Sequence, residues 1–374
     1  MRFLHLGDLH LGKKLNDVDL LEDQKYALEQ ALEQADKVDC VLISGDVYDK
    51  ADPKAEAMTL FDGFITSLVA KNKKIFIISG NHDSDQRISY FSKLLKENNV
   101  FFTSKFEGVL QTYELEDEYG KLYIHLLPFL KPIHVKRIYP EESIKSYEDA
   151  IKVVLEKSNV DTSKRNIILV HQFITGSERS DSEEYTVGGL DNIDYSVFDN
   201  FDYVALGHIH KPQHIVRETL RYSGSLLKYS FSEEKQNKSF CLVDVKEKGN
   251  IEITKEPIKF LHDVVTKEGL LEDILKQDYS EDYIRVILHD EDILPDTRIK
   301  LLTIFPNMMK FSVENSKTKY EKDVISGEEF ENKSIKELFI DFYKFKNNNQ
   351  EPDEARLQLF DEVLKKMEDR QWNL

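Results

Sequence analysis

Carboxylate, imidazole and amide side chains recur in five short segments of this 374-residue chain, and each segment directly follows an apolar run typical of a β-strand. The segments are residues 8–10, 45–49, 80–83, 171 and 207–210. Oxygen and imidazole donors without cysteine suit Mn²⁺, Fe²⁺ or Zn²⁺. The residue types therefore predict a divalent-metal site.

Spacing within the segments indicates how such a site would be built. Asp8 and His10 are two positions apart, as are His208 and His210, so both members of each pair can face the same side of an extended chain. Two such pairs, a bridging carboxylate and two lone ligands are enough for a dinuclear site. Two metal ions roughly 3.5–4 Å apart can clamp a phosphoryl group and generate hydroxide near neutral pH. The spacing thus favours phosphoester hydrolysis.

The elements that carry these segments are strands alternating with helices. Strands are expected at residues 3–7, 40–44, 74–79, 166–170 and 203–206, with helices at 18–37 and 52–70. Glycines before Asp46, Asn81 and His208 permit sharp turns where the strands end. In open α/β sheets, sites form in the crevice beyond the carboxyl ends of the strands. We therefore expect one α/β domain with a mixed sheet over residues 1–256.

The pattern changes after Pro257. Residues 257–330 are expected to form a small α+β unit, with strands at 258–261, 283–289 and 308–313 and a polar linker at its end. Residues 331–374 then carry two amphipathic helices, the first opened by a capping box of Ser334 and Glu337. These helices could form a small bundle on the parent domain or a docking module for a partner.

Composition limits how the chain can meet its partners. Acidic residues number 69 and basic residues 51, giving a net charge of −18, so bulk charge will not hold nucleic acid or an anionic membrane. A local patch could still contact phosphates, although a solvated scatter is equally compatible: Lys13, Lys14, Lys131, Lys136, Arg137, Arg221 and Lys228. Apolar runs near 18 residues are absent and both cysteines lie in strand-like runs, so we expect a cytoplasmic protein.

The five segments, in this order, resemble the D-x-H, G-D-x-x-D, G-N-H-D, H and G-H-x-H motifs of the calcineurin-like metallophosphoesterase superfamily. The opening H-L-G-D-L-H-L-G-K, the segment 20–24 and the Y-S-G-S segment that continues from 222 to 233 are similar to the SbcD family of bacterial nuclease subunits, a double-strand-break repair branch. The resemblance implies an α/β fold: a β-sandwich flanked by helices, with a small α+β capping domain at 257–330 and a C-terminal helical pair.

The resemblance also implies residue roles. One metal ion would be held by Asp8, His10 and His210, the other by Asn81, His171 and His208, with Asp46 bridging them. His82 would be the catalytic imidazole, protonating the leaving oxygen or stabilising the phosphorane. Asp49 would support the site, whereas archaeal and eukaryotic relatives carry histidine there, which argues against a two-histidine mechanism. Asp83 would hold the ligands in place.

The implied activity is that of a metal-dependent DNA nuclease with two divalent ions, Mn²⁺ being expected. Such enzymes act as 3′–5′ double-strand exonucleases and single-strand or hairpin endonucleases. They work on duplex ends and hairpins in DNA repair, replication and recombination. The resemblance further implies a homodimer and an SbcC-type ABC ATPase partner docked on residues 331–374. The chain has no G-x-x-x-x-G-K-[ST] motif, so ATP binding is expected in the partner.

Two other functions are compatible with the core motifs. One is a phosphomonoesterase or cyclic-nucleotide phosphodiesterase of the same superfamily, against which the Y-S-G-S segment and the extra domain argue. The other is a metal-bound scaffold without catalysis, which the presence of His82 and every expected ligand disfavours. The protein-phosphatase branch carries an arginine soon after G-D-x-x-D, whereas Lys50 and Ala51 follow that motif here.

Overall fold

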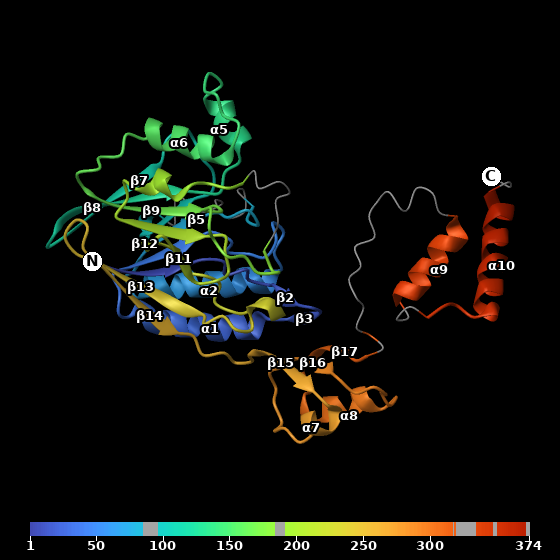
Figure 1. The fold of residues 1–374 in the computed structure, drawn as a ribbon. Coiled ribbons are helices and arrows are strands. Elements are labelled where there is room, and N and C mark those ends of the chain that lie inside the picture. Colours follow the sequence, from blue (N-terminus) through green and yellow to red (C-terminus); the bar gives the residue numbers. More distant parts are fainter. Residues whose placement is uncertain (85–95, 184–190, 317, 319–333, 347–349, 372–374) are drawn as a thin grey trace. The chain divides into compact units, whose positions relative to one another are not determined.

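The computed structural model describes residues 1–84, 96–183, 191–316, 318, 334–346 and 350–371. The chain divides into two compact units, Met1–Val264 and Val265–Leu374 (Figure 1). The three-part division expected from the sequence remains a prediction. Among the described helices, none combines the length and the apolar character needed to cross a membrane.

Two six-stranded mixed sheets build the first unit. The first sheet runs in the order β14 (Ile251–Pro257), β13 (Ser239–Val245), β1 (Arg2–Leu6), β4 (Cys40–Ser44), β5 (Lys74–Ile78) and β6 (Val100–Thr103). The second runs in the order β11 (Gln213–Ile215), β12 (Arg217–Tyr222), β10 (Tyr203–Gly207), β9 (Arg165–His171), β8 (Gly120–Leu127) and β7 (Gln111–Asp117). One apolar core takes side chains from both sheets, including Phe3, Phe76 and Ile167. The arrangement is a β-sandwich.

The single mixed sheet expected from the strand pattern is therefore wrong, whereas the sandwich implied by the resemblance is correct. The central strands β4, β9 and β10 are buried along their whole length. Two stacked sheets bury both faces of such strands more easily than one open sheet of twelve strands would. Within each sheet the site-bearing strands are parallel: β1 with β4 and β4 with β5, and β9 with β10.

Helices lie on the outer sides of the sandwich (Figure 1). The helices α1 (Leu21–Ala35) and α2 (Ala55–Ala70) lie beside the first sheet, and α5 (Pro132–Ile138) and α6 (Tyr147–Lys157) pack on the second. The helix expected from residue 18 starts later because β2 (Lys14–Leu15) and β3 (Val18–Asp19) first form a hairpin. The helix expected from residue 52 starts at Ala55 because Lys54 is still extended (φ −66°, ψ 152°).

The second unit contains a three-stranded sheet in the order β15-β16-β17. Its elements are β15 (Val264–Gly269), α7 (Leu271–Ile274), β16 (Tyr283–Leu288), α8 (Thr297–Ile304), β17 (Met308–Val313), α9 (Ile335–Lys346) and α10 (Glu354–Gln371). The strand expected at 258–261 is wrong, because the Gln30 amide bonds the backbone N and O of Lys259 at 3.0 and 2.8 Å in place of a strand ladder. Ser334 and Glu337 form the expected cap at 2.7 Å.

Candidate metal centre

The site lies where five loops leave the carboxyl ends of β1, β4, β5, β9 and β10. Four of its residues have positive φ although none is glycine: Asp8 (51°), His10 (44°), Asp46 (50°) and His208 (104°). Such backbone is uncommon for these residue types and costs free energy. Four such residues in neighbouring loops indicate that the direction of their side chains is retained despite the cost of the strained backbone.

Glycines in the same loops are required by close contact as well as by turning. A Cβ on Gly80 would lie 2.1 Å from Asp46 Oδ1, and one on Gly207 would lie 1.9 Å from the carbonyl oxygen of Ser44. Gly45 has φ +87°, and a Cβ there would also meet His171 Nδ1 at 2.4 Å. The sharp turn expected from sequence describes Gly45; Gly80 and Gly207 instead let neighbouring loops touch.

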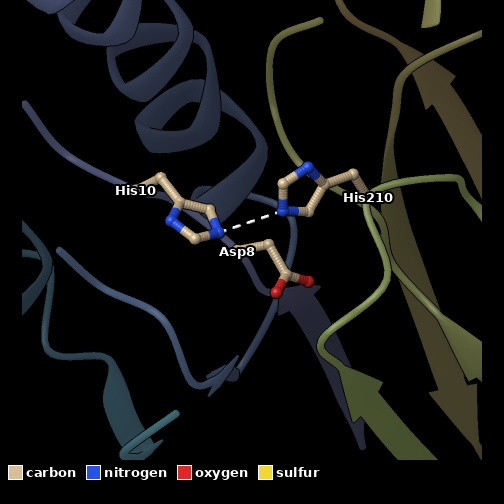
Figure 2. A group of neighbouring side chains, drawn as sticks. All are labelled: Asp8, His10 and His210. Atoms are coloured by element: carbon tan, nitrogen blue, oxygen red, sulfur yellow. Dashed lines mark hydrogen bonds between the residues drawn. The ribbon is translucent and has the colours of Figure 1, made fainter. Parts of the chain in front are cut away.

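The first ligand group is Asp8, His10 and His210, whose ligand atoms lie within 4.8 Å of one another (Figure 2). His10 Nε2 lies 3.0 Å from His210 Nε2. Asp8 Oδ1 accepts a hydrogen bond from the backbone N–H of His208 at 2.8 Å, whereas Asp8 Oδ2 is buried and has no hydrogen-bond partner among the described residues. A buried carboxylate oxygen is costly to leave unpaired. A cation between these three side chains would satisfy it, so the donor set fits a metal ion.

The second group is Asn81, His171 and His208. Asn81 Oδ1 lies 3.0 Å from both His171 Nε2 and His208 Nδ1. Asp46 Oδ2 lies 3.3 Å from His171 Nε2 and 3.5 Å from His10 Nε2, so one carboxylate reaches both groups. Ligands at right angles and about 2.1 Å from an ion are about 3 Å apart. All seven side chains expected as ligands are thus brought together at metal-binding spacing.

Hydrogen bonds to backbone carbonyls fix which ring nitrogen carries a proton. His171 Nδ1 lies 2.7 Å from the carbonyl oxygen of Ser44, and His82 Nδ1 lies 2.9 Å from that of Asp49. A carbonyl only accepts, so both Nδ1 atoms carry hydrogen. His171 Nε2 is then the atom that faces the ligands, and His82 Nε2 is free to face a substrate.

Burial sets the electrostatics of the site. Burial alone would raise the pKa of Asp46, but the charges at His171 and His10 outweigh it and hold that pKa well below its usual range. Burial, reinforced by the Asp46 charge, raises the pKa of Asp8 to about 7. Burial and the His171 charge lower the pKa of His208 to about 3, which keeps it a neutral imidazole. The buried carboxylates need positive charge, which divalent cations would supply.

Two further acids lie around the ligands. Asp49 Oδ1 lies 3.8 Å from His10 Nδ1 and accepts from Lys13 Nζ at 2.8 Å. Asp83 accepts from the backbone N–H groups of Gly80, Val47 and Tyr48 at 2.9, 3.2 and 3.1 Å. Asp83 therefore ties the loop after β5 to the loop after β4.

Several positioning residues escaped the motif analysis. The Tyr222 hydroxyl donates to the carbonyl oxygen of Gln172 at 2.9 Å and accepts from the N–H of Ile174 at 2.8 Å, which holds the loop after His171. The Tyr229 hydroxyl donates to the carbonyl oxygen of Leu9. Gln24 Nε2 donates to the carbonyl oxygen of His10 at 2.7 Å. The signal was the resemblance of segments 20–24 and 222–233, which carried no assigned role.

Three of the seven basic residues considered for a phosphate-binding patch are paired with acids in the structure. Arg221 is buried and paired with Glu218, and Lys228 is buried and 2.7 Å from Asp263. Lys13 is engaged by Asp49. These three cations are engaged within the protein, and the other four considered for the patch are exposed: Lys14, Lys131, Lys136 and Arg137.

Comparison with known proteins follows from this geometry. The calcineurin-like phosphoesterase family model matches residues 1–212, more than half of the chain, and the type 5 capsule protein repressor C-terminal domain matches residues 261–347. The SbcD subunit of nuclease SbcCD from Staphylococcus epidermidis (strain ATCC 12228 / FDA PCI 1200) is 35% identical over 322 residues, covering 83% of this chain and 85% of the relative. The chain belongs to the SbcD family of calcineurin-like phosphoesterases.

Membership confirms the resemblance and the fold class. The chain is a hydrolase that acts on phosphodiester bonds, and its family uses divalent metal ions. Solved structures are more distant. The crystal structure of a Thermus thermophilus protein is 14% identical, with TM-score 0.37 over 68% of this chain and 98% of that one. A novel archaeal phosphodiesterase is 13% identical, with TM-score 0.30 over 68% of this chain and 99% of that one.

Proposed function

We propose that the chain is the nuclease subunit of an SbcCD-type complex, in which it hydrolyses DNA phosphodiester bonds with two Mn²⁺ ions. The observation that carries the proposal is the convergence of six side chains suited to metal binding around Asp46, with Asp8 Oδ2 buried and without a hydrogen-bond partner in the described part of the chain. The similarity to the SbcD subunit of nuclease SbcCD supports DNA as the substrate.

The two ligand groups would each hold one ion. Asp8, His10 and His210 would hold one, Asn81, His171 and His208 the other, with Asp46 shared. Bound there, the ions would polarise the phosphoryl oxygens and lower the pKa of the attacking water. Oxygen and neutral imidazole donors without thiolate are compatible with Mn²⁺.

His82 is the proposed catalytic residue. Its Nδ1–H donates to the carbonyl oxygen of Asp49, which sets the plane of the ring and points Nε2 away from that bond. In the imidazolium form, with a second hydrogen on Nε2, the ring would give that proton to the leaving oxygen and keep the Nδ1–H. Its backbone N–H donates to Asp46 Oδ1 at 2.9 Å, so its position is tied to the shared carboxylate. Asp49 acts as a positioning residue that fixes His82 through its carbonyl and approaches His10 through its carboxylate.

Exposed apolar side chains in the second unit support the proposal that it binds a partner protein. Large apolar side chains are exposed on α9, at Ile335 and Phe342, and on α10, at Leu359 and Val363. We assign residues 1–256 to the nuclease domain, 257–330 to the capping domain and 331–374 to docking of an SbcC-type ABC ATPase, which would bind the ATP. That partner would also supply much of the grip on DNA, consistent with the net charge of −18. We also propose that the substrates are duplex ends and hairpins, that exonucleolytic cleavage runs in the 3′–5′ direction, and that the subunit forms a homodimer.

A substrate panel tests the proposed activity. The purified chain is incubated with Mn²⁺ or EDTA and one of four substrates: an end-labelled linear duplex, a hairpin, a small phosphomonoester or a cyclic nucleotide. We expect Mn²⁺-dependent cleavage of the duplex and the hairpin. Turnover confined to the phosphomonoester or the cyclic nucleotide would replace the nuclease with another phosphoesterase while leaving the metal centre intact.

A further inference from the structure

His210 is held at three of its atoms by one group of side chains, of which Glu183, Glu233 and Lys238 are buried and Ser182 is half-buried. Its backbone N–H donates to Glu183 Oε1 at 2.7 Å, and its carbonyl oxygen accepts from Lys238 Nζ at 2.7 Å. Its ring Nδ1 lies 2.6 Å from Ser182 Oγ. Ser182 in turn donates to Glu233, which pairs with Lys238 at 2.6 Å. We call Ser182, Glu183, Glu233 and Lys238 the His210 cluster.

In the His210 cluster, each group of the chain from the His210 ring through Ser182 to Glu233 donates to the next. The Glu233 carboxylate, paired with Lys238, can only accept, so Ser182 Oγ gives its single proton to Glu233 Oε1. Ser182 Oγ must therefore accept from His210, which places the ring proton on Nδ1. The lone pair of His210 is then on Nε2, the atom that lies 3.0 Å from His10 Nε2 in the first ligand group.

The buried ion pair of Glu233 and Lys238 is not explained by its contribution to stability alone. Glu233 and Lys238 are both fully buried, and the cost of removing two charges from water often cancels their mutual attraction. Here the pair keeps a carboxylate at the end of a hydrogen-bond chain that leads to a metal ligand. Outer partners of this kind orient a ligand ring, and their loss typically lowers metal affinity 10- to 100-fold.

We propose that Glu233 is a positioning residue which, acting through Ser182, fixes His210 as an Nε2 metal ligand. The proposal rests on the proposed metal-dependent function and deepens it. It also gives a role to the end of the segment 222–233, which the motifs alone left without one. Glu183 and Lys238 hold the backbone of His210, while Ser182 and Glu233 hold its ring.

A matched control is needed to distinguish positioning of the His210 ring from simple anchoring of the loop, and Ser180 provides it. Ser180 Oγ also bonds Glu233 Oε1, at 3.3 Å, and it bonds Glu183 Oε2 at 2.9 Å. It differs from Ser182 in that no hydrogen bond joins it to His210 among the described residues. Ser180→Ala therefore removes a loop anchor of the same type, whereas Ser182→Ala removes the link to the ring.

Calorimetric titration of the full-length, metal-free chain with Mn²⁺ compares these variants. We expect Ser182→Ala to weaken binding at one of the two sites by roughly 10- to 100-fold. Ser180→Ala should stay within about twofold of wild type, and Ser182→Thr, which keeps the hydroxyl, should recover most of the loss. Thermal unfolding of each metal-free variant checks that the fold is kept. Glu233→Gln would leave Lys238 buried and unpaired, so Ser182 carries the test.

Nitrogen NMR of the metal-free, ¹⁵N-histidine-labelled chain reads the ring proton without any metal. Wild type should show Nδ1-protonated imidazoles that include His82, His171 and His210, and we expect the His210 signal alone to be lost in Ser182→Ala. Wild-type Mn²⁺ affinity in Ser182→Ala, or equal losses in Ser182→Ala and Ser180→Ala, would overturn the positioning role. If the wild-type chain bound no Mn²⁺, the proposed metal function would fail, and an unchanged NMR signal in Ser182→Ala would separately refute the ring assignment.

Discussion

His82 differs from three of the other imidazoles at the centre in its exposure. The rings of His10, His171 and His210 are buried, whereas His82 is only half-buried. A buried imidazole can serve an ion but cannot reach a substrate, and a half-buried one can do so. Exposure gives His82 access to a substrate, but the expected ligand His208 is half-buried too, and a ring nitrogen of His82 lies within 4.8 Å of ligand atoms of His10 and Asp46. The role of His82 is therefore decided by its replacement.

Replacement of the His82 ring tests whether it transfers a proton or binds a metal ion. We expect His82→Ala to lower kcat about 10²- to 10⁴-fold, the usual contribution of a positioned acid, while Mn²⁺ affinity stays within a few-fold. His134→Ala, which removes an exposed imidazole on α5, is the control and should leave both quantities unchanged. Steady-state kinetics at saturating Mn²⁺ and calorimetry provide the measurements. Near wild-type turnover in His82→Ala would show that another group supplies the proton.

His5 illustrates a buried imidazole with a structural role. Ser44 Oγ donates to the carbonyl oxygen of Ala205 at 2.9 Å, so His5 Nε2 donates to Ser44 and His5 Nδ1 accepts from the Tyr203 hydroxyl at 2.9 Å. Burial, with the charge of Arg221, lowers the pKa of His5 to about 3. The folded protein therefore keeps His5 neutral between pH 3 and 6.5, where the unfolded chain takes up a proton.

This difference makes stability depend on pH in a defined direction. Because the unfolded state binds more protons in that window, the His5 contribution is full above about pH 6.5 and falls by about 1.4 kcal/mol per pH unit below it. Urea unfolding at about pH 7.5 and about pH 5.5 compares wild type with His5→Gln, which cannot titrate. We expect the advantage of wild type to shrink by about 1.4 kcal/mol between the two. A difference that does not change with pH would contradict the buried neutral state.

At the scale of elements, the ends of the strands set the site. Loops from β1, β4 and β5 in one sheet meet loops from β9 and β10 in the other, and glycines allow the meeting. The contact between Gly80, after β5, and Asp46, after β4, leaves no room for a side chain. The geometry of the shared carboxylate therefore depends on the absence of a single methyl group.

A pair of glycine substitutions measures that dependence. Gly80→Ala would place its Cβ against Asp46, so we expect Mn²⁺ affinity to fall at least about tenfold, with a loss of stability of roughly 1–3 kcal/mol. Gly63 lies inside α2, where an added Cβ would have no described atom within 4 Å apart from its own helix backbone and chain neighbours. Gly63→Ala should therefore raise stability by about 0.5–1 kcal/mol. Calorimetry and thermal unfolding report both effects. Unchanged Mn²⁺ affinity in Gly80→Ala would mean that the two loops can separate freely.

The site-bearing strands could be predicted because their apolar runs are continuous and each ends in a polar segment. The pairing of strands could not, since β1 lies between β4 and β13, and its partner residues on β13 are more than 230 positions away. Local periodicity carries no information on such partners. The strand pattern therefore predicted one mixed sheet, whereas the strands form two.

The ligands were predictable for a different reason from their supports. Asp8, His10 and the other ligands sit in short motifs whose residue types alone indicate metal binding. Ser182 and Glu233 lie 28 and 23 positions from His210, in loop sequence that looks like ordinary polar surface. Only the fold shows that the two lie together in a hydrogen-bond chain that ends at the His210 ring. Chemistry concentrated in motifs can be read from sequence, whereas hydrogen-bond chains across loops cannot.

At the scale of the whole molecule, catalysis and partner docking are assigned to separate units. The first unit has its own cores between and outside its two sheets. Deletion of residues 334–374 should therefore leave basal Mn²⁺-dependent cleavage within about twofold and abolish association with an SbcC-type ATPase. Size-exclusion chromatography of the mixed proteins and a duplex cleavage assay measure the two effects. Co-elution of the truncated chain with the ATPase would refute the docking assignment.

A point variant sharpens this prediction. Phe342 on α9 is 59% exposed, and Ile299 on α8 is 68% exposed. Phe342→Asp should weaken ATPase binding by at least about tenfold, as loss of a buried aromatic contact would. Ile299→Asp, which alters a similarly exposed apolar residue outside the helical pair, should not. Equal effects of the two variants would point to nonspecific damage to the second unit.

The dinuclear centre is the claim on which the rest depends, and anomalous diffraction from crystals grown with Mn²⁺ tests it most directly. We predict two peaks about 3.5–4 Å apart. One should be bounded by Asp8, His10 and His210, the other by Asn81, His171 and His208, and Asp46 should touch both. A single peak, or peaks remote from Asp46, would contradict the account.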